Sequence, residues 1–247
     1  MRAKGMLIDF TRCIGCRACV AACKERNNLP PEEDADLTSR TLTVVNRRRG
    51  IFVSRLCMNC REPACASACL VGALQKRANG PVVYDKARCI GCRYCLLACP
   101  FGVPSYEWDK PLPKVMKCDF CAERQAAGKL PACVEVCPVS ARIFGDREQL
   151  LEEAKARIRK NPERYVRAVY GEKEVGGTSV LLLSSVPFDQ VGYATTLTTD
   201  PLPSYTWKAL SKIPKVVLAG GVFLYGLVWI VNRRNRLAGG GPENKET

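Results

Sequence analysis

Short apolar runs in the first half of the chain predict strands rather than long helices. Residues 6–10 and 82–84 are two such runs, and each is followed by a turn and the sequence Arg-Cys-Ile-Gly-Cys-Arg. Segments 6–17 and 82–93 therefore form an internal repeat, which indicates two related structural units. Between them lies an insertion at residues 24–56, in which strand-like runs at 41–45 and 51–54 flank a basic turn and predict a hairpin.

A helical pattern begins at Asp146, a suitable N-cap residue, and continues to about Asn161. Its apolar stripe consists of Leu150, Leu151, Ala154 and Ile158. Residues 165–170 and 178–184 have the pattern of strands, whereas 187–205 have that of an irregular linker. Residues 102–113 form a proline-rich loop, whose Tyr106 and Trp108 we expect to pack near the functional centre rather than to react.

The composition changes at residues 216–231, which are sixteen uncharged, mostly apolar residues between Lys215 and Arg233. A membrane-spanning helix needs roughly 17–25 apolar residues, so this segment is at the short end of the range. We expect a single transmembrane helix at 213–233 and a polar tail at 234–247, with a buried core helix as the alternative. Three basic residues lie on each side of the segment. Because the two sides are equal in basic residues, their distribution does not predict the orientation of the helix in the membrane.

All sixteen cysteines fall into four groups of four. The first group is Cys13, Cys16, Cys19 and Cys23, and the third is Cys89, Cys92, Cys95 and Cys99; both have the spacing C-x2-C-x2-C-x3-C. The second group is Cys57, Cys60, Cys65 and Cys69, with C-x2-C-x4-C-x3-C. The fourth group is Cys118, Cys121, Cys133 and Cys137, with C-x2-C-x11-C-x3-C.

The first and third groups match the cysteine run of bacterial ferredoxins, which holds [4Fe–4S] clusters. Three cysteines in one tight loop point to three corners of a cluster, whereas the fourth points away and ligates another cluster. At four ligands per cluster, the chain is predicted to hold four [4Fe–4S] clusters. So many redox centres indicate that the chain carries electrons.

Two other uses of the cysteines agree less well with the pattern. Disulfide scaffolds are typical of small secreted domains, and no secretory signal precedes Cys13. Zinc sites usually combine two well-separated pairs of ligands, whereas C-x2-C-x2-C places three in one loop. Histidine is absent, which excludes a Rieske centre or haem with histidine ligands from this chain and removes the usual general base.

The formal net charge of the chain is +14. Because each [4Fe–4S] cluster with four thiolates carries about −2, four clusters would leave roughly +6. Much of the basic excess is therefore expected to balance the clusters, and no motif supports nucleic-acid binding. Six basic residues lie beside the cysteines and could raise cluster potentials or simply be solvated: Arg12, Arg17, Arg61, Arg88, Arg93 and Lys117.

The four groups in this order, with an insertion after the first and a gap inside the fourth, resemble the four-cluster iron–sulfur subunits of the dimethyl sulfoxide reductase family. The resemblance covers about residues 1–190. Residues 176–188 and the single C-terminal span look like the beta subunit of membrane-bound formate dehydrogenase, and equally like the ferredoxin-type subunit of hydrogenase-2-like enzymes.

This resemblance implies an α+β fold with a single C-terminal transmembrane helix. Two ferredoxin-like [4Fe–4S] modules with insertions would occupy residues 1–145. A helix and strands at 146–190 would cover the cluster core, and 191–212 would be a linker to the transmembrane helix.

The resemblance also implies that the first group pairs with the fourth and the second with the third. Cluster 1 then takes Cys13, Cys16, Cys19 and Cys137, and cluster 2 takes Cys57, Cys60, Cys65 and Cys99. Cluster 3 takes Cys89, Cys92, Cys95 and Cys69, and cluster 4 takes Cys118, Cys121, Cys133 and Cys23. Spacing alone predicts only that the fourth cysteines cross between clusters.

We therefore expect a non-catalytic electron-transfer subunit. A catalytic large subunit with a molybdenum- or tungsten-pterin or a nickel–iron site would oxidise a substrate such as formate or hydrogen. A quinone-reactive or cytochrome b subunit in the membrane would take up the electrons. The alternatives are a complex running as a reductase and a stand-alone polyferredoxin.

The resemblance suggests a location as well. Relatives of the formate dehydrogenase type cross the membrane folded, together with a partner that carries a twin-arginine signal. We therefore expect the cluster domain on the periplasmic face of the cell membrane, with the cytoplasmic face as the alternative.

Overall fold

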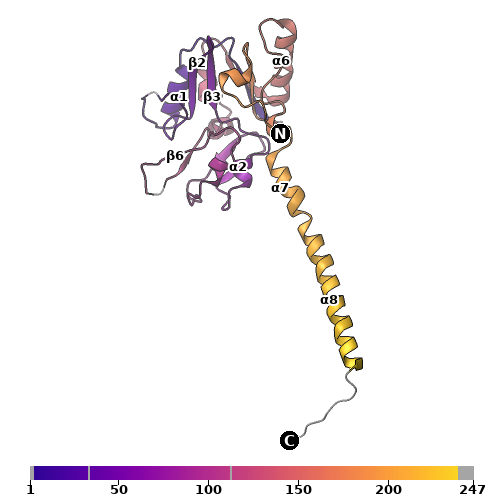
Figure 1. Ribbon diagram of the computed structural model, residues 1–247. Helices are drawn as coiled ribbons and strands as arrows, with labels where there is room; N and C mark the ends of the chain where they lie inside the picture. The colour runs from indigo at the N-terminus through magenta and orange to yellow at the C-terminus, as the bar shows by residue number, and fades with distance from the viewer. Residues whose placement is uncertain (1–2, 33, 112, 239–247) are drawn as a thin grey trace. The chain divides into compact units, whose positions relative to one another are not determined.

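The computed structural model describes residues 3–32, 34–111 and 113–238, and the chain divides into two compact units, Met1–Pro203 and Ser204–Thr247. Figure 1 shows the elements of both units. In chain order they are β1 (Lys4–Asp9), α1 (Ala18–Arg26), β2 (Thr43–Arg48), β3 (Ile51–Leu56), α2 (Ala64–Ser67), β4 (Leu74–Lys76), β5 (Val82–Tyr84), α3 (Tyr94–Leu97), β6 (Ser105–Tyr106), β7 (Val115–Met116), α4 (Ala122–Ala126), α5 (Ala132–Glu135), β8 (Arg142–Asp146), α6 (Arg147–Lys160), η1 (Glu174–Gly176), β9 (Val180–Leu183), η2 (Phe188–Val191), α7 (Leu202–Leu210) and α8 (Ile213–Ala238).

The first unit contains a three-stranded sheet with the strand order β8-β1-β9. β1 runs antiparallel to β8, with Ile8 opposite Arg142, and parallel to β9, with Leu7 opposite Leu181. Because successive side chains of a strand point to opposite faces, Met6 and Ile8 lie on one face and Leu7 on the other. The sheet can therefore support a different core on each side.

The two faces of this sheet have different neighbours. Met6 and Ile8 belong to a core that includes Cys133, with Cys19 and Cys118 packed against it. On the opposite face, Leu7 and two residues of β9 pack with Leu150, Leu151 and Ala154 of α6. Residues 146–190 therefore share the sheet with the N-terminal segment, and α6 covers the face that is turned away from these cysteines.

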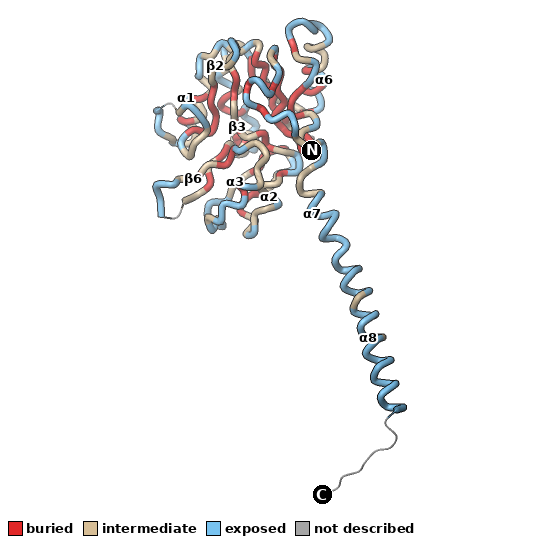
Figure 2. The backbone as a smooth tube through the Cα atoms, viewed as in Figure 1, coloured by how far each residue is buried: buried red, intermediate tan, exposed pale blue. Residues whose placement is uncertain are grey.

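A separate core lies among the short strands in the middle of the chain. It contains Leu74, Val82, Cys95, Tyr106 and Val115, with Cys65 and Cys69 packed against it. β4 pairs with β5, and β6 pairs with β7, in two antiparallel ladders. The burial of these strands is visible in Figure 2. Cysteines thus line both of the cores that lie away from α6.

Several local expectations are confirmed. β2 and β3 form the predicted hairpin, and Arg49 and Gly50 make its turn with φ angles of 49° and 83°, as in a type I′ turn. The helix α6 and the strand β9 also lie where the pattern placed them. Asp146 occupies the N-cap position but makes no capping hydrogen bond, because its Oδ1 accepts one from Lys4 Nζ at 2.7 Å.

Three other expectations are wrong. Residues 165–170 form no strand beyond a single bridge from Tyr170 to Leu182, since their apolar residues are buried individually in turns. The segment 187–205 is not an irregular linker, because η2 and Tyr193 are packed in the core and α7 begins at Leu202. The loop at 102–113 contains β6, which pairs with β7.

The second unit consists of a helix that is long and apolar enough to cross a membrane. Within the helical segment Leu202–Ala238, the most apolar stretch of 18 residues has a mean hydropathy of 1.8, and none of its residues is buried (Figure 2). The 26 residues of α8 rise by about 39 Å, against about 30 Å for a bilayer core. The predicted apolar helix is thus confirmed and continues to Ala238; residues 239–247 of the predicted tail lie outside the described residues.

Candidate metal centre

Short helices carry the third cysteine of every group. Cys19 lies in α1, Cys65 in α2, Cys95 in α3 and Cys133 in α5. α1 is longer and also contains Cys23, whereas Cys69, Cys99 and Cys137 come two residues after their helices. The last two cysteines of each group therefore lie about one helical turn apart. The first two lie in the preceding loop in the first three groups, whereas in the fourth group Cys118 and Cys121 lie before α4.

The internal repeat has the same backbone in both copies. Gly15 and Gly91 both have a φ angle of 73°, and Arg17 and Arg93 have left-handed φ angles of 59° and 65° at the N-caps of α1 and α3. A left-handed residue at these positions turns the chain sharply before the helix begins. The two Cys-Ile-Gly-Cys-Arg loops are thus equivalent structures.

The fold brings together cysteines from different groups in four sets. We number these sets like the clusters expected from the sequence: set 1 (Cys13, Cys16, Cys19, Cys137), set 2 (Cys57, Cys60, Cys65, Cys99), set 3 (Cys89, Cys92, Cys95, Cys69) and set 4 (Cys118, Cys121, Cys133, Cys23). All four cysteines of set 1 line one small cavity, together with Arg142 and apolar residues such as Ile8 and Val45. Their surroundings are therefore mostly apolar, with Arg142, Arg17 and Ser54 as the polar exceptions.

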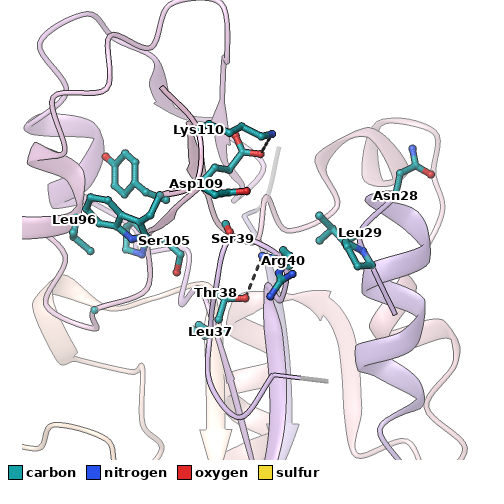
Figure 3. A pocket seen from close by; sticks show the side chains of 16 residues that line it. Asn28, Leu29, Leu37, Thr38, Ser39, Arg40, Leu96, Ser105, Asp109 and Lys110 are labelled. Carbon is teal, nitrogen blue, oxygen red and sulfur yellow. Dashed lines mark hydrogen bonds and ion pairs between the residues drawn. The ribbon is translucent and has the colours of Figure 1, made fainter. Parts of the chain in front are cut away.

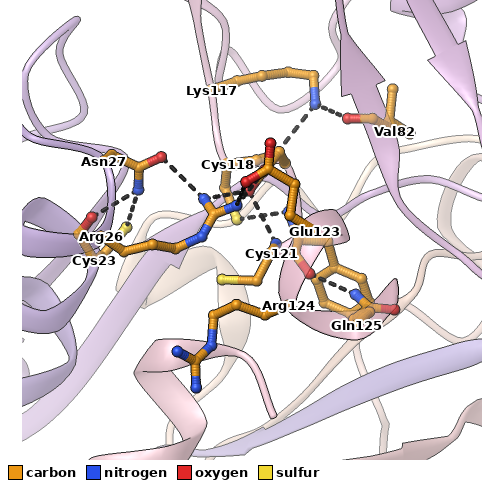
Figure 4. A network of polar contacts seen from close by, with 12 residues as sticks. Cys23, Arg26, Asn27, Val82, Lys117, Cys118, Cys121, Glu123, Arg124 and Gln125 are labelled. Carbon is orange, nitrogen blue, oxygen red and sulfur yellow. Dashed lines mark hydrogen bonds and ion pairs between the residues drawn. The ribbon is translucent and has the colours of Figure 1, made fainter. Parts of the chain in front are cut away.

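Three members of set 4, Cys23, Cys118 and Cys121, lie within a polar network (Figure 4). Asn27 Nδ2 donates to the carbonyl oxygen of Cys23 at 2.6 Å and lies 3.6 Å from its sulfur. Arg26 forms an ion pair with Asp119 at 2.8 Å, and Asp119 Oδ1 accepts a hydrogen bond from the backbone N–H of Cys121 at 2.9 Å. These contacts fix the loops that carry Cys23 and Cys121.

Sets 2 and 3 are recognised from their mutual electrostatics. Burial raises the pKa of Cys60, and the nearby Cys57, Cys99 and Cys65 add to the rise. Burial also raises the pKa of Cys95; the Tyr106 hydroxyl opposes this rise, and Cys69, Cys89 and Cys92 add to it. The three cysteines that raise the pKa of Cys60 are the other members of set 2, and the three that raise the pKa of Cys95 are the other members of set 3.

Neighbouring sets also lie within electrostatic range of each other. Cys133 of set 4 contributes to the raised pKa of Cys19 in set 1, after burial. Cys57 of set 2 likewise contributes to the raised pKa of Cys118 in set 4. Cys95 of set 3 contributes to the raised pKa of Cys65 in set 2. These electrostatic effects link the sets in the order 1, 4, 2, 3.

The donors around the sulfurs suit thiolates that hold a cluster. Backbone N–H groups donate to sulfur in three places: Ala73 to Cys69 at 3.2 Å, Gly91 to Cys89 at 3.4 Å and Phe120 to Cys118 at 3.4 Å. Burial raises the pKa of Cys23 to about 12, and the thiols of Cys133 and Cys121 add to this rise. Thiolates in such positions need positive partners, which bound iron supplies.

A single metal ion suits these residues less well. Within residues 3–32, 34–111 and 113–238, no three His, Cys, Asp or Glu side chains converge closely enough to hold one ion. In a cubane cluster each cysteine binds a different iron, so its ligands need not converge on one point. The arrangement of the cysteines therefore fits [4Fe–4S] clusters better than zinc.

Basic side chains are buried near the cysteines, but most are not those expected from the sequence. Of the six basic residues named above, only Lys117 is buried, and its Nζ donates to the carbonyl oxygens of Val82 and Cys118. Sequence reasoning missed Lys76, whose Nζ donates to the carbonyl oxygen of Cys60 at 2.7 Å, and Arg142. No motif marks either residue: Lys76 lies 16 residues from Cys60, and Arg142, although it closely follows Cys137, meets Cys13 and Cys19 from another part of the chain.

A surface pocket lies apart from the cysteines, between residues 28–40 and 102–110 (Figure 3). Its lining includes Leu29, Arg40 and Trp108, and none of the residues that line it is a cysteine. Arg93 stacks on the Trp108 ring at 4.5 Å from its centroid, and Trp108 packs on Tyr106 at 5.7 Å between ring centroids. This pocket is therefore not the metal centre.

Two protein families match this sequence. Residues 4–25 match the family described as a 4Fe-4S binding domain, and residues 49–147 match the 4Fe-4S dicluster domain. Together these two regions contain all sixteen cysteines. They identify the chain as a [4Fe–4S] protein, with enough ligands for four clusters.

Relatives with known names cover most of the sequence. Hydrogenase-2 operon protein HybA of Escherichia coli O157:H7 is 37% identical, over 76% of this chain and 71% of the relative. The nitrate-inducible formate dehydrogenase iron-sulfur subunit of Escherichia coli K12 is 38% identical, over 71% of this chain and 66% of the relative. YnfG of the same strain, a probable anaerobic dimethyl sulfoxide reductase chain, is 39% identical, over 60% of this chain and 76% of the relative. Similarity of this extent, together with the two family matches, shows that the protein belongs to the [4Fe–4S] iron–sulfur subunits of the dimethyl sulfoxide reductase family.

Proposed function

We propose that the protein is the electron-transfer subunit of a membrane-bound oxidoreductase complex and holds four [4Fe–4S] clusters, one in each cysteine set. Set 1 would hold cluster 1, and sets 2, 3 and 4 the clusters of the same numbers. The cavity lined by Cys13, Cys16, Cys19 and Cys137 supports this assignment, as do the mutual pKa effects within the other sets. On this proposal, two paired modules combine the first group with the fourth and the second with the third.

The observation that carries the proposal is the order in which the sets are linked. Three electrostatic effects between sets, of Cys133 on Cys19, of Cys57 on Cys118 and of Cys95 on Cys65, link them in the single sequence 1, 4, 2, 3. A linear order of this kind suits a conductor with two ends rather than four independent sites. Only Cys16 in set 1 and Cys92 in set 3 are exposed among the cysteines, and both belong to the end sets.

The protein's own residues would position the clusters and adjust their potentials, since the redox chemistry belongs to the cofactor. Electrons would enter at one exposed end and leave at the other. One end would face a catalytic large subunit of the formate dehydrogenase or nickel–iron hydrogenase type. The other would face a quinone-reactive or cytochrome b subunit, with the apolar helix Leu202–Ala238 in the membrane.

The ligand assignment can be tested by counting iron in pairs of substitutions. The wild-type protein should bind about 16 iron atoms. Cys19→Ala with Cys137→Ala removes two ligands of cluster 1, so about four irons should be lost. Cys19→Ala with Cys23→Ala changes only the helix α1 but removes ligands of clusters 1 and 4, so about eight should be lost. Equal losses from the two pairs would contradict the crossed assignment.

The partners can be tested by purifying the native protein from its membranes. The proposal expects a large subunit with molybdenum, tungsten or nickel, and a membrane subunit with haem or quinone. The similarity to a probable dimethyl sulfoxide reductase subunit favours a second candidate, a complex that runs as a reductase. The substrate that changes the redox state of the clusters in the purified complex decides between these two. Purification as a monomer would instead favour a stand-alone polyferredoxin.

We also propose that the cluster unit lies on the periplasmic face of the cell membrane. The proposal is supported by the likeness to a formate dehydrogenase iron-sulfur subunit. Protease added to intact spheroplasts should then remove residues up to about 203 and leave the apolar helix. Protection in spheroplasts and cleavage only after lysis would place the unit on the cytoplasmic face.

A further inference from the structure

Arg142 is a buried guanidinium at the edge of the cysteine cavity. It is the first residue of β8, five residues after Cys137, and its side chain lines the cavity formed by the four cysteines of set 1. Only 4% of its surface is exposed. Burial of a charge this complete requires compensation by hydrogen bonds or by an opposite charge.

The hydrogen bonds of Arg142 to hydroxyl groups are made by one nitrogen of its guanidinium, Nη2. Nη2 donates to the hydroxyl of Thr43 at 3.3 Å and to that of Ser54. Both hydroxyls belong to the β2–β3 hairpin and are themselves buried. Nη1 is also buried, and no hydrogen-bond partner exists for it among the described residues. The hairpin thus holds the guanidinium with one donor nitrogen free.

No carboxylate balances the charge of Arg142. None of the ion pairs found in the described parts of the chain includes it. The thiol of Cys133, in set 4, interacts most strongly with its charge and is within hydrogen-bonding reach of its side chain. Cys19 and Cys23 follow, and Cys13 is also within range. An unpaired buried cation costs several kcal/mol, so an anionic group is expected beside it.

Arg147 shows how a buried arginine is satisfied without a cluster. It is 2% exposed and lies only five residues further along the chain. Its guanidinium donates to the carbonyl oxygens of Thr178 and Gly171 at 2.6 and 3.1 Å, and it pairs with Glu148 at 2.9 Å. Burial alone therefore does not explain why Arg142 lacks such partners.

We propose that Arg142 is a positioning residue for cluster 1, donating a hydrogen bond from Nη1 to a sulfur of that cluster and balancing part of its negative charge. This inference rests on the proposed function, since it requires a cluster in set 1. A positive charge stabilises the reduced, more negative cluster and so raises its reduction potential. Cluster 4 is affected as well, because its ligand Cys133 is the thiol that interacts most strongly with Arg142, and clusters 2 and 3 are not affected.

The inference gives the insertion at residues 24–56 a role. The hairpin within it supplies Thr43 and Ser54, the two hydroxyls that orient Arg142. Replacing both hydroxyls by Thr43→Val and Ser54→Ala should loosen the guanidinium while leaving its charge in place. The reduction potential of cluster 1 should then fall, as it does when the arginine is replaced, but by a smaller amount.

The test is a redox titration by EPR of the purified protein with its clusters. The signal of cluster 1 is identified by its absence from the Cys19→Ala, Cys137→Ala variant. Arg142→Gln should reduce the equilibrium constant for reduction of cluster 1 at least tenfold, which is about 59 mV for a one-electron couple. Arg142→Lys keeps the charge and should retain most of the potential. Arg147→Gln is the matched control and should leave all four potentials unchanged.

Each outcome has a definite meaning. If Arg142→Gln lowers the reduction potential of cluster 1, with or without a change at cluster 4, and leaves those of clusters 2 and 3 unchanged, the inference is supported. Loss of about four irons from Arg142→Gln, with full iron in Arg142→Lys, also supports it, since the charge is then needed to hold the cluster. Unchanged potentials in Arg142→Gln with full iron, or an equal shift in Arg147→Gln, would overturn it. A wild-type protein without about 16 irons would instead refute the proposed function itself.

Discussion

The hydroxyl oxygen of Tyr106 lies 3.0 Å from the sulfur of Cys95, and both side chains are buried. Burial raises the pKa of Tyr106, and the contact with Cys95 adds to the rise, so the hydroxyl keeps its proton at neutral pH. When Cys95 binds iron as a thiolate, the hydroxyl is therefore the donor. This relationship makes Tyr106 a tuning residue for cluster 3 in the proposed function.

Tyr106→Phe is expected to lower the reduction potential of cluster 3 without loss of iron. The substitution removes a donor to a ligand sulfur, and such donors raise cluster potentials. A redox titration followed by EPR measures the change. Tyr170→Phe is the matched control, because the Tyr170 hydroxyl donates to the carbonyl oxygen of Ala194 at 2.8 Å rather than to sulfur. Equal potentials in Tyr106→Phe and the wild type would count against the donor role.

The two repeat glycines should respond differently to the same substitution. Alanine at Gly15 or at Gly91 meets the same backbone strain, since both have φ of 73°, at about 1–2 kcal/mol. A methyl group on Gly15 would also overlap the ring of Phe52, whereas one on Gly91 would meet only the carbonyl oxygen of Pro113 at 3.5 Å. Gly15→Ala should therefore lose cluster 1 more readily than Gly91→Ala loses cluster 3, as measured by iron content after a fixed time in urea.

A second substitution separates the two causes. Phe52→Ala opens the space beside residue 15 without changing its φ angle. The double variant Gly15→Ala, Phe52→Ala should hold iron about as well as Gly91→Ala. A double variant that remains as weak as Gly15→Ala alone would show that overlap with the ring is not the reason.

Local patterns predicted the elements whose stabilisation is local. The β2–β3 hairpin and α6 follow from alternation and helical periodicity, and the apolar helix follows from composition. The first three cysteine groups could be recognised because one loop and one helical turn carry each of them, whereas α4 separates the two halves of the fourth. The pairing of groups stays a prediction from family resemblance, since spacing alone leaves the partner of each fourth cysteine open.

Contacts between distant segments could not be predicted in this way. Arg142 meets Thr43 and Ser54 across 99 and 88 residues, so no motif near Arg142 reveals its partners. The segment that begins at Pro187 has the composition of a linker, yet Phe188 lies 5.0 Å from Tyr170 between ring centroids. Isolated aromatic residues in turns give no periodic signal, and only the folded core shows that they are buried.

Asp9 is a fully buried carboxylate whose replacement should destabilise the sheet. Its Oδ1 accepts hydrogen bonds from the backbone and hydroxyl of Thr11 at 3.0 and 2.7 Å. Its Oδ2 accepts from Arg157 at 3.1 Å and from the Tyr165 hydroxyl at 2.9 Å. Asp9→Asn turns acceptors into donors and breaks a buried ion pair, so about 3 kcal/mol of stability should be lost.

The control for Asp9 is Tyr165→Phe, which removes one of these hydrogen bonds and should cost only about 1 kcal/mol. Urea unfolding of the iron-loaded proteins, followed by circular dichroism, compares the two midpoints. Similar midpoints for both variants would mean that the ion pair with Arg157 contributes little.

The apolar helix should determine whether the protein remains in the membrane. Leu224 lies in the middle of the apolar segment of α8, and Leu237 follows the basic residues near its end. A charge at the centre of a bilayer costs about 2.5–3.5 kcal/mol, whereas one near the interface reaches water. When the protein is expressed by itself, Leu224→Arg should shift it from the membrane pellet to the soluble fraction with its iron content unchanged. Leu237→Arg adds the same charge and should stay in the membrane pellet. If the Leu224→Arg protein also stays in the pellet, the helix is not the anchor.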